Sequence, residues 1–88
     1  MDDEMLKIYA YVSISSYRRK TVKVLEYGDK TPTEIAKDSN IRINHISKVL
    51  KELKDTNIVV CINEQDRKGR IYHLTDFGQN IAGHLEDL

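Results

Sequence analysis

The fold of this chain is decided by residues 31–74, TPTEIAKDSNIRINHISKVLKELKDTNIVVCINEQDRKGRIYHL. The stretch predicts a short helix, a sharp turn and a longer helix, followed by two strands joined by a polar, basic loop. The first helix begins after Thr31, a good N-cap, with proline next and Glu34 completing a capping box. Asn40 ends that helix, because asparagine tolerates the left-handed backbone that a tight turn requires.

The longer helix, at about residues 43–56, has the clearest periodicity in the chain. At about 100° per residue, its apolar side chains fall in one narrow sector and its polar side chains lie opposite or on the flanks. The apolar group is Ile46, Val49, Leu50 and Leu53, and the polar group is Asn44, His45, Ser47, Lys48 and Lys51. The two strands are predicted at residues 58–62 and 70–74, with a loop that closes on Gly69 as a hairpin tip should.

The segments before this stretch are less distinct. Residues 6–12 alternate apolar and polar side chains, which favours a short strand, but a helical stripe of Met5, Ile8, Tyr9 and Val12 also fits. A serine at position 13, 15 or 16 then caps a helix predicted to end at Gly28. Its expected core side is Tyr17, Thr21, Val24 and Leu25, and its basic side is Arg18, Arg19, Lys20 and Lys23.

A last helix is predicted from Asp76, with Thr75 as its cap. Its apolar stripe is Phe77, Ile81, Leu85 and Leu88. No internal repeat, linker or low-complexity segment interrupts the 88 residues, which are the size of one small domain with one core. We therefore expect a single α+β domain over residues 1–88, mainly helical, with an antiparallel hairpin and flanking N- and C-terminal elements.

The composition restricts the chemistry. The single Cys61 cannot form an internal disulfide, and with three scattered histidines it makes no recognisable metal site, so we expect neither metal nor cofactor. Cys61 stands between two apolar neighbours in the sequence, so we interpret it as a packing residue rather than a redox sensor. A redox-sensing cysteine needs exposure and a nearby cation. A free cysteine behind an acidic N-terminus without a long apolar run predicts a cytoplasmic protein with no membrane span. Association with a second copy would supply stability that a domain this small otherwise lacks.

The charge is balanced but unevenly placed. The whole chain holds 14 Lys and Arg against 14 Asp and Glu. Residues 15–70 contain 13 of the basic and 8 of the acidic residues, whereas acids gather at the two ends. A local basic face, rather than the total charge, is what meets phosphate. The neutral balance lowers the expectation of strong non-specific nucleic-acid binding and leaves site-specific binding open.

The longer helix has the residues needed to read DNA. A helix that enters the major groove, about 12 Å wide, needs an apolar back and a polar front that reaches base edges. Asn44 can pair with adenine, and Lys48 and Lys51 can reach guanine or phosphate. His45 and Ser47 can contact either a base edge or a phosphate. Arg42 lies at the start of the helix, where its long side chain can reach a backbone phosphate. The alternative interpretation of this face is an ordinary solvated helix surface.

Other candidate contacts lie outside that helix. Arg67, Lys68 and Arg70 surround the hairpin tip and can lie in a minor groove or on phosphate. The helix start at Thr31 and Thr33 offers free N–H groups to phosphate, beside its capping role. A further phosphate contact is possible at the basic run that begins with Arg18 and Arg19. Solubility alone also accounts for charged hairpin tips and solvated helix faces.

The motifs TEIAK, HISKVLKEL and RKGR-x-Y-x-LT carry a resemblance to a known class. Over about residues 15–85, the chain resembles the winged helix-turn-helix of small prokaryotic transcriptional regulators, the ArsR/MarR-like class, and most of all compact archaeal-type members. The resemblance implies a two- to three-stranded wing, a recognition helix at the second helix of the pair, and a homodimer built through N-terminal or C-terminal segments. The chain departs from the metal-sensing branch, because it has no metal-binding cysteine pair.

Two functions follow from these features. The leading hypothesis is a sequence-specific regulator of transcription that binds double-stranded DNA as a homodimer. The second is a winged-helix protein–protein interaction module of the transcription machinery, which would use the same helix or hairpin against another protein. The basic loop and polar helix front favour DNA, and the zero net charge keeps the alternative open. An enzyme is not expected, since the chain shows no plausible acid–base pair, activated nucleophile or phosphate-binding glycine loop.

Overall fold

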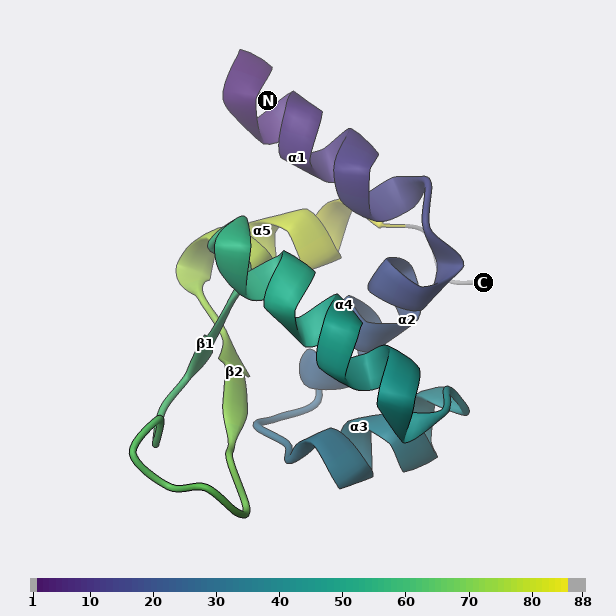
Figure 1. The fold of residues 1–88 in the computed structure, drawn as a ribbon. Coiled ribbons are helices and arrows are strands. Elements are labelled where there is room, and N and C mark those ends of the chain that lie inside the picture. The colour runs from purple at the N-terminus through teal and green to yellow at the C-terminus, as the bar shows by residue number, and fades with distance from the viewer. Residues whose placement is uncertain (1, 86–88) are drawn as a thin grey trace.

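The computed structural model describes residues 2–85. Within them, helices surround a small core and a hairpin extends from one side (Figure 1). The elements are α1 (Asp3–Ser13), α2 (Ser16–Leu25), α3 (Pro32–Ser39), α4 (Ile43–Asp55), β1 (Val59–Cys61), β2 (Tyr72–Leu74) and α5 (Asp76–His84). The expected mainly helical α+β architecture is confirmed. No helix in the described part of the chain is long and apolar enough to cross a membrane.

The N-terminal segment is a helix, so the strand predicted at residues 6–12 is wrong. Asp2 caps α1 by accepting a 2.8 Å hydrogen bond from the Met5 N–H, and two acidic residues in the first turn suit the positive helix end. Val12 is fully buried, and the rest of the helical stripe packs against the core. The alternation of apolar and polar side chains in residues 6–12 does not reflect a strand, because the side chains that are buried follow the spacing of a helix.

Helix α2 lies at the centre of the domain and contacts α1, α3, α4, α5 and β2. Ser15 caps it, as one of the candidate serines, and it ends at Leu25, three residues before Gly28. Its buried residues are Thr21, Val22 and Leu25. Val22 was not predicted, and Tyr17 is 40 % exposed rather than in the core. The buried face is wider than expected because neighbouring elements cover α2 on several sides.

The pair α3 and α4 follows the sequence closely. The capping box at Thr31 and Glu34 is present, and Asn40 has a left-handed backbone with φ of 60°. The predicted apolar side of α4 is buried throughout. Helix α4 ends in a Schellman motif, in which the Ile58 N–H donates to the Leu53 carbonyl at 2.9 Å and Asn57 has φ of 62°.

The hairpin pairs β1 with β2 in antiparallel register, with Val60 opposite His73. On the other side of β2, Tyr72 exchanges two backbone hydrogen bonds with Lys30, at 2.8 and 3.1 Å. That isolated bridge gives the hairpin a short third partner and ties it to the connection between α2 and α3. The loop closes at Gly69, whose φ of 67° lies in the left-handed region that favours glycine.

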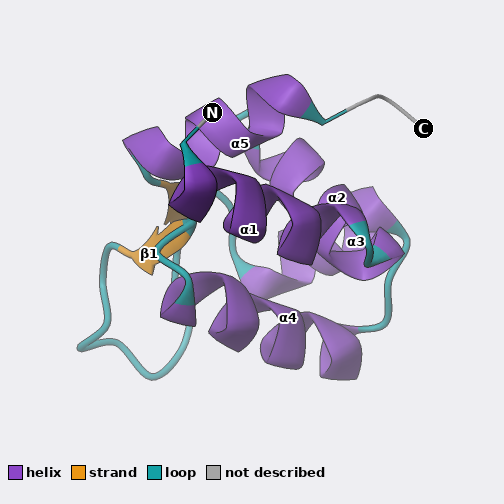
Figure 2. Cartoon of the chain, turned by 90° about the horizontal axis from the view of Figure 1, so that it is seen from above, coloured by secondary structure: helices purple, strands orange, loops and turns teal. Residues whose placement is uncertain are grey.

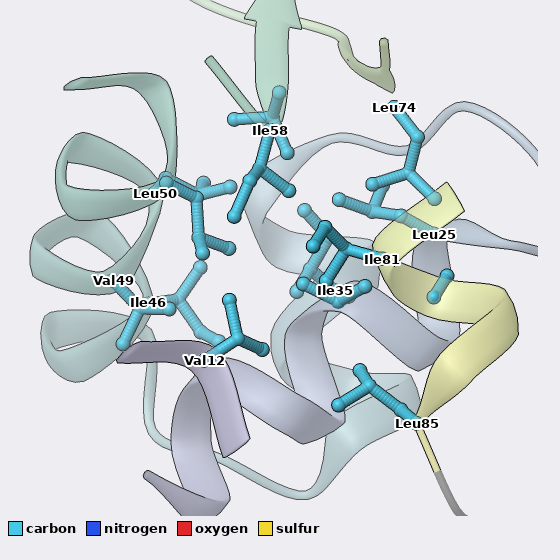
Figure 3. Packing of buried hydrophobic residues seen from close by; sticks show 14 of the residues in the cluster. Val12, Leu25, Ile35, Ile46, Val49, Leu50, Ile58, Leu74, Ile81 and Leu85 are labelled. Atoms are coloured by element: carbon cyan, nitrogen blue, oxygen red, sulfur yellow. The ribbon is translucent and has the colours of Figure 1, made fainter. Parts of the chain in front are cut away.

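The core draws side chains from every helix and from both strands (Figure 3). Its fully buried members include Val12, Val22, Ile35, Ile46, Leu53, Ile58, Val59, Ile81 and Ala82. The predicted stripe of α5 is buried at Ile81 and Leu85 and half-buried at Phe77, while Leu88 lies outside the described residues. One core thus holds α4 firmly along its apolar side.

Helix α5 approaches the end of α4 at a glycine. A Cβ on Gly78 would lie 2.2 Å from the Ile58 carbonyl oxygen and 3.2 Å from a Leu74 methyl carbon. The Thr75 hydroxyl accepts from the Gly78 N–H at 2.9 Å, so the first turn of α5 is fixed against the chain that leaves α4. Only glycine allows this approach.

We expect Gly78→Ala to lower the free energy of unfolding by ~1–3 kcal/mol, because the added methyl overlaps a fixed backbone carbonyl. Gly83→Ala in the same helix is the matched control, since nothing lies within 4 Å of its added Cβ. The control should be neutral or slightly stabilising. Urea denaturation measures both. If the two variants unfold with equal free energies, the Ile58 carbonyl does not restrict the side chain at position 78.

Candidate nucleic-acid interface

The polar side of α4 faces away from the core. Every sequence-predicted residue on it is exposed, namely Arg42, Asn44, His45, Ser47, Lys48 and Lys51. The opposite side packs on α2 and α3. From Arg42 to Lys51 the sequence contains no acidic residue. Helix α4 therefore presents a polar and basic surface on a rigidly held backbone.

Two details of this surface were not predicted. Ile43 is 48 % exposed at the start of α4, where an apolar side chain can contact a thymine methyl group. The His45 ring lies 5.3 Å from that of Tyr17, so α2 borders the polar face. A phase count from the sequence could have placed Ile43 outside the apolar sector, but the contact with Tyr17 depends on how α2 crosses α4.

The start of α3 is already occupied by its own cap. The Thr31 N–H donates to the Glu34 carboxylate at 2.9 Å, and the Glu34 N–H donates to the Thr31 hydroxyl at 3.3 Å. The hydrogen bond from the Thr31 backbone lowers the pKa of Glu34, so this carboxylate is charged at neutral pH. Thr33 is exposed beside it. The Thr31 hydroxyl accepts from Glu34 and keeps its own O–H as a donor, whereas the Thr33 hydroxyl makes no hydrogen bond within residues 2–85.

Arg18 connects three helices instead of pointing to solvent. Its guanidinium donates to both Glu52 oxygens on α4, at 3.2 and 3.4 Å, and to the Tyr11 carbonyl on α1 at 2.9 Å. It also lies 3.7 Å from the centre of the Tyr11 ring, a cation–π contact. Arg19 donates to the Ser13 carbonyl. The structure thus places Arg18 and Arg19 at the junction of α1 and α2, where both side chains are engaged in contacts within the domain.

The hairpin loop carries the remaining predicted cations. Arg67 and Lys68 are exposed at its tip, and neither forms an ion pair within residues 2–85. Arg70 is also exposed, but its guanidinium donates to the Asp66 carbonyl at 2.8 Å and the Glu64 carbonyl at 3.2 Å. Arg70 therefore helps to shape the loop, while Arg67 and Lys68 extend from it.

Asn63 organises the loop, a role that the sequence did not reveal. Its amide donates to the Asp66 carboxylate at 3.0 Å and to the Gly69 carbonyl at 3.1 Å. Its side-chain oxygen accepts from the Ile71 N–H at 2.7 Å and from the Cys61 thiol at 3.5 Å. Cys61 is half-buried beside it. These bonds close the loop across its base, so the tip cations are carried on a defined turn.

A groove separates α4 from the hairpin. It has a volume of about 390 Å³ and is lined by Pro32, Ser47, Leu50, Lys51, Lys54, Arg70 and Tyr72. Lys54 was not among the predicted site residues, and it forms an ion pair with Glu64 of the loop. Figure 2 shows the loop projecting beyond the helices. The polar side of α4 and the loop are thus the two sides of one basic depression.

Metal binding has no support in this part of the molecule. Within residues 2–85, no group of three or more His, Cys, Asp or Glu side chains is placed to hold a metal ion. The side chains that gather along α4 and the hairpin are mainly amides, hydroxyls and cations, and the Glu64 and Asp66 carboxylates of the loop are each bonded to a side chain of the same region. The chemistry of the amides, hydroxyls and cations suits hydrogen bonding to base edges and to phosphate.

Comparison with solved protein structures agrees with the arrangement of helices and hairpin described above. A solved structure of a MarR family transcription regulator superimposes with a TM-score of 0.62 at 20% sequence identity, and the match covers 88% of this chain and 57% of that one. The likeness shows that the fold is a winged helix, as the resemblance implied. The chain spans little more than half the length of that regulator. No curated protein sequence matches the chain.

A family model gives the assignment by sequence. The model described as sugar-specific transcriptional regulator TrmB matches residues 19–77, which include α3, α4, both strands and the loop between them. The expected membership among small winged helix-turn-helix regulators is confirmed by this match together with the fold. The matched residues make up more than half of the chain, and so the chain belongs to the TrmB family of transcriptional regulators.

Proposed function

We propose that this protein is a sequence-specific transcriptional regulator that binds double-stranded DNA in the cytoplasm as a homodimer. Helix α4 enters the major groove, and the basic hairpin lies on the backbone or in the minor groove. The observation that carries the proposal is the surface of α4, where polar and basic residues from Arg42 to Lys51 are exposed on a helix whose other side is buried.

Each residue of that surface has a role. Asn44 and Lys48 lie one helical turn apart and can hydrogen-bond to adenine and guanine edges. His45 and Ser47 flank them, and Arg42 and Lys51 lie where backbone phosphates border the groove. Thr33 at the start of α3 is an additional candidate for phosphate. Arg18 stays an indirect contributor, because its guanidinium holds α4 through Glu52.

A second copy would cover an apolar stripe on α1. Leu6 is 53 % exposed, Ile14 is 78 % exposed, and Ala10 lies exposed between them. These residues share one side of the helix, facing away from the buried Val12. Two copies of α1 crossing at the small Ala10 would bury both large side chains. Such a dimer would set two α4 helices on half-sites about one DNA turn apart, at roughly 34 Å.

Selection of bound fragments from random duplex DNA at physiological salt tests the function directly. A homodimer is expected to enrich a palindromic sequence, since two-fold protein symmetry requires two equivalent half-sites. Failure to enrich any sequence, together with capture of a component of the transcription machinery, would support the protein-interaction alternative. The half-exposed Val60 and Ile62 on the hairpin are the surface that such a partner would meet.

Asn44→Ala and Lys48→Ala should each weaken binding to the selected sequence by about fivefold or more, because a paired base contact is worth about 1–3 kcal/mol. The melting temperature should change little, since both side chains are exposed. Lys7→Ala removes the same charge from α1 and is the control, with sedimentation to verify its oligomeric state. Titration by fluorescence anisotropy compares the variants. Parent-like affinity of both α4 variants would rule out α4 as the reading helix.

Removing the tip cations should change the salt dependence of binding. Each lost phosphate contact reduces the slope of log K against log salt concentration by about 0.9. The double variant Arg67→Ala/Lys68→Ala should therefore have a slope lower by up to about 1.8 for each protomer, or about 3.6 for the homodimer, if both cations meet phosphate. Affinities measured across a salt series give the slope. A slope identical to that of the parent would mean that the loop does not touch the backbone.

The variant Leu6→Glu/Ile14→Glu should sediment as a monomer, because it places charges in the proposed dimer surface. Its helical content should equal that of the parent, since neither side chain belongs to the core. Tyr27→Glu is the matched control, as Tyr27 is 86 % exposed outside the stripe. Analytical ultracentrifugation distinguishes the outcomes. A dimer that survives both glutamates would locate the interface elsewhere.

A further inference from the structure

The groove between α4 and the hairpin brings together basic side chains from two separate elements. Lys51 and Lys54 come from α4, and Arg70 comes from the strand side of the loop. Ser47 and Tyr72 also line the groove, although the Ser47 hydroxyl makes a long 3.5 Å hydrogen bond to the Ile43 carbonyl. Cations around an open depression bind a phosphate group through charge-assisted hydrogen bonds.

One acidic side chain reaches these cations from the loop. The Glu64 carboxylate accepts a hydrogen bond from the Lys54 ammonium, and so links the hairpin to α4. Both partners are about half exposed, with 47% and 53% of the side-chain surface accessible. An ion pair so open to water contributes little to folding stability and can exchange partners.

The charges of this pair are stable at neutral pH. The hydrogen bond from Lys54 lowers the pKa of Glu64, and the same bond raises the pKa of Lys54. Each shift favours the charged form of its group. A ligand that approaches the groove at neutral pH therefore meets a lysine whose charge is already matched by a carboxylate.

We propose that a backbone phosphate of bound DNA occupies this groove and competes with Glu64 for Lys54. This inference rests on the proposed DNA-binding function and adds a site to it. The phosphate replaces the carboxylate as the partner of Lys54, while Lys51, Ser47 and Tyr72 complete its surroundings. Glu64 thus lowers the affinity of the parent protein for every DNA sequence, and base reading by α4 is left unchanged.

The substitution Glu64→Gln removes the competing charge and keeps the size of the side chain. Lys54 is then free for phosphate, and the variant should bind the selected DNA about 1.4- to 5-fold more tightly for each protomer, the range that an exposed ion pair represents. The slope of log K against log salt concentration should rise by up to about 0.9 for each protomer. The loop should keep its shape, because Arg70 bonds to the Glu64 backbone carbonyl and not to its carboxylate.

A double-mutant cycle separates competition for Lys54 from a general effect of charge. The gain from Glu64→Gln should disappear in a Lys54→Met background, because no ammonium remains to be released. Asp55→Asn removes one negative charge next to Lys54 in the sequence and is the matched control, since Asp55 forms no ion pair within residues 2–85. Thermal melting of every variant verifies the fold.

Three results would overturn the inference. Parent-like affinity of Glu64→Gln would show that Glu64 does not compete. An equal gain in the Lys54→Met background, or from Asp55→Asn, would show a general charge effect. In each of these three cases the parent still binds its selected DNA, so the proposed function stands. A parent that binds no duplex DNA would instead refute the function and the phosphate site together.

Discussion

The position of the hairpin relative to α4 depends on the backbone of one residue, Ile58. Its N–H donates to the Leu53 carbonyl in the last turn of α4, and its carbonyl accepts from the Thr75 N–H at 3.0 Å. The Thr75 hydroxyl also reaches that carbonyl at 3.2 Å, and Gly78 packs directly on it. The side chain of Ile58 is fully buried. The end of α4, the base of the hairpin and the start of α5 therefore meet at a single peptide unit.

This junction explains how so small a domain can hold α4 and the hairpin in a fixed relation. A hairpin of three-residue strands has little stability of its own. It gains support at both ends of β2, from the Lys30 bridge on one side and from Thr75 and Ile58 on the other. Backbone hydrogen bonds at Ile58, Thr75 and Lys30 thus help to fix the position of the hairpin beside Lys51 and Lys54.

The parts of the fold that sequence predicted are those with local causes. The capping box at Thr31, the left-handed Asn40 and the apolar stripe of α4 all arise within a few residues of one another. The helix α1 was missed because a seven-residue alternation fits both periodicities, and the cap at Asp2 was the signal that would have decided it. The burial of Val22 could not be seen, since it results from helices that cover α2 on several sides.

The candidate site shows the same difference between features with local causes, which the sequence predicts, and features that depend on tertiary contacts. Helical phase predicted which side chains of α4 are exposed, but it could not say which cations are already engaged. Arg18 is bound to Glu52 across 34 positions of sequence, and Lys54 to Glu64 across 10. Asn63 organises the loop through contacts that only the closed hairpin creates. Whether a basic side chain is free to bind a ligand depends on its contacts in the tertiary structure, and a count of basic residues does not reveal these contacts.

The shortness of β1 has a consequence for the behaviour of the protein at high concentration. Among the described residues, β2 is flanked on both sides, whereas β1 has a neighbour only in β2. An uncovered edge strand with half-exposed Val60 and Ile62 is a surface on which another chain could add a strand. Three residues, however, offer too few backbone groups to support a long intermolecular ladder. The brevity of the strand thus protects the domain from edge-to-edge aggregation.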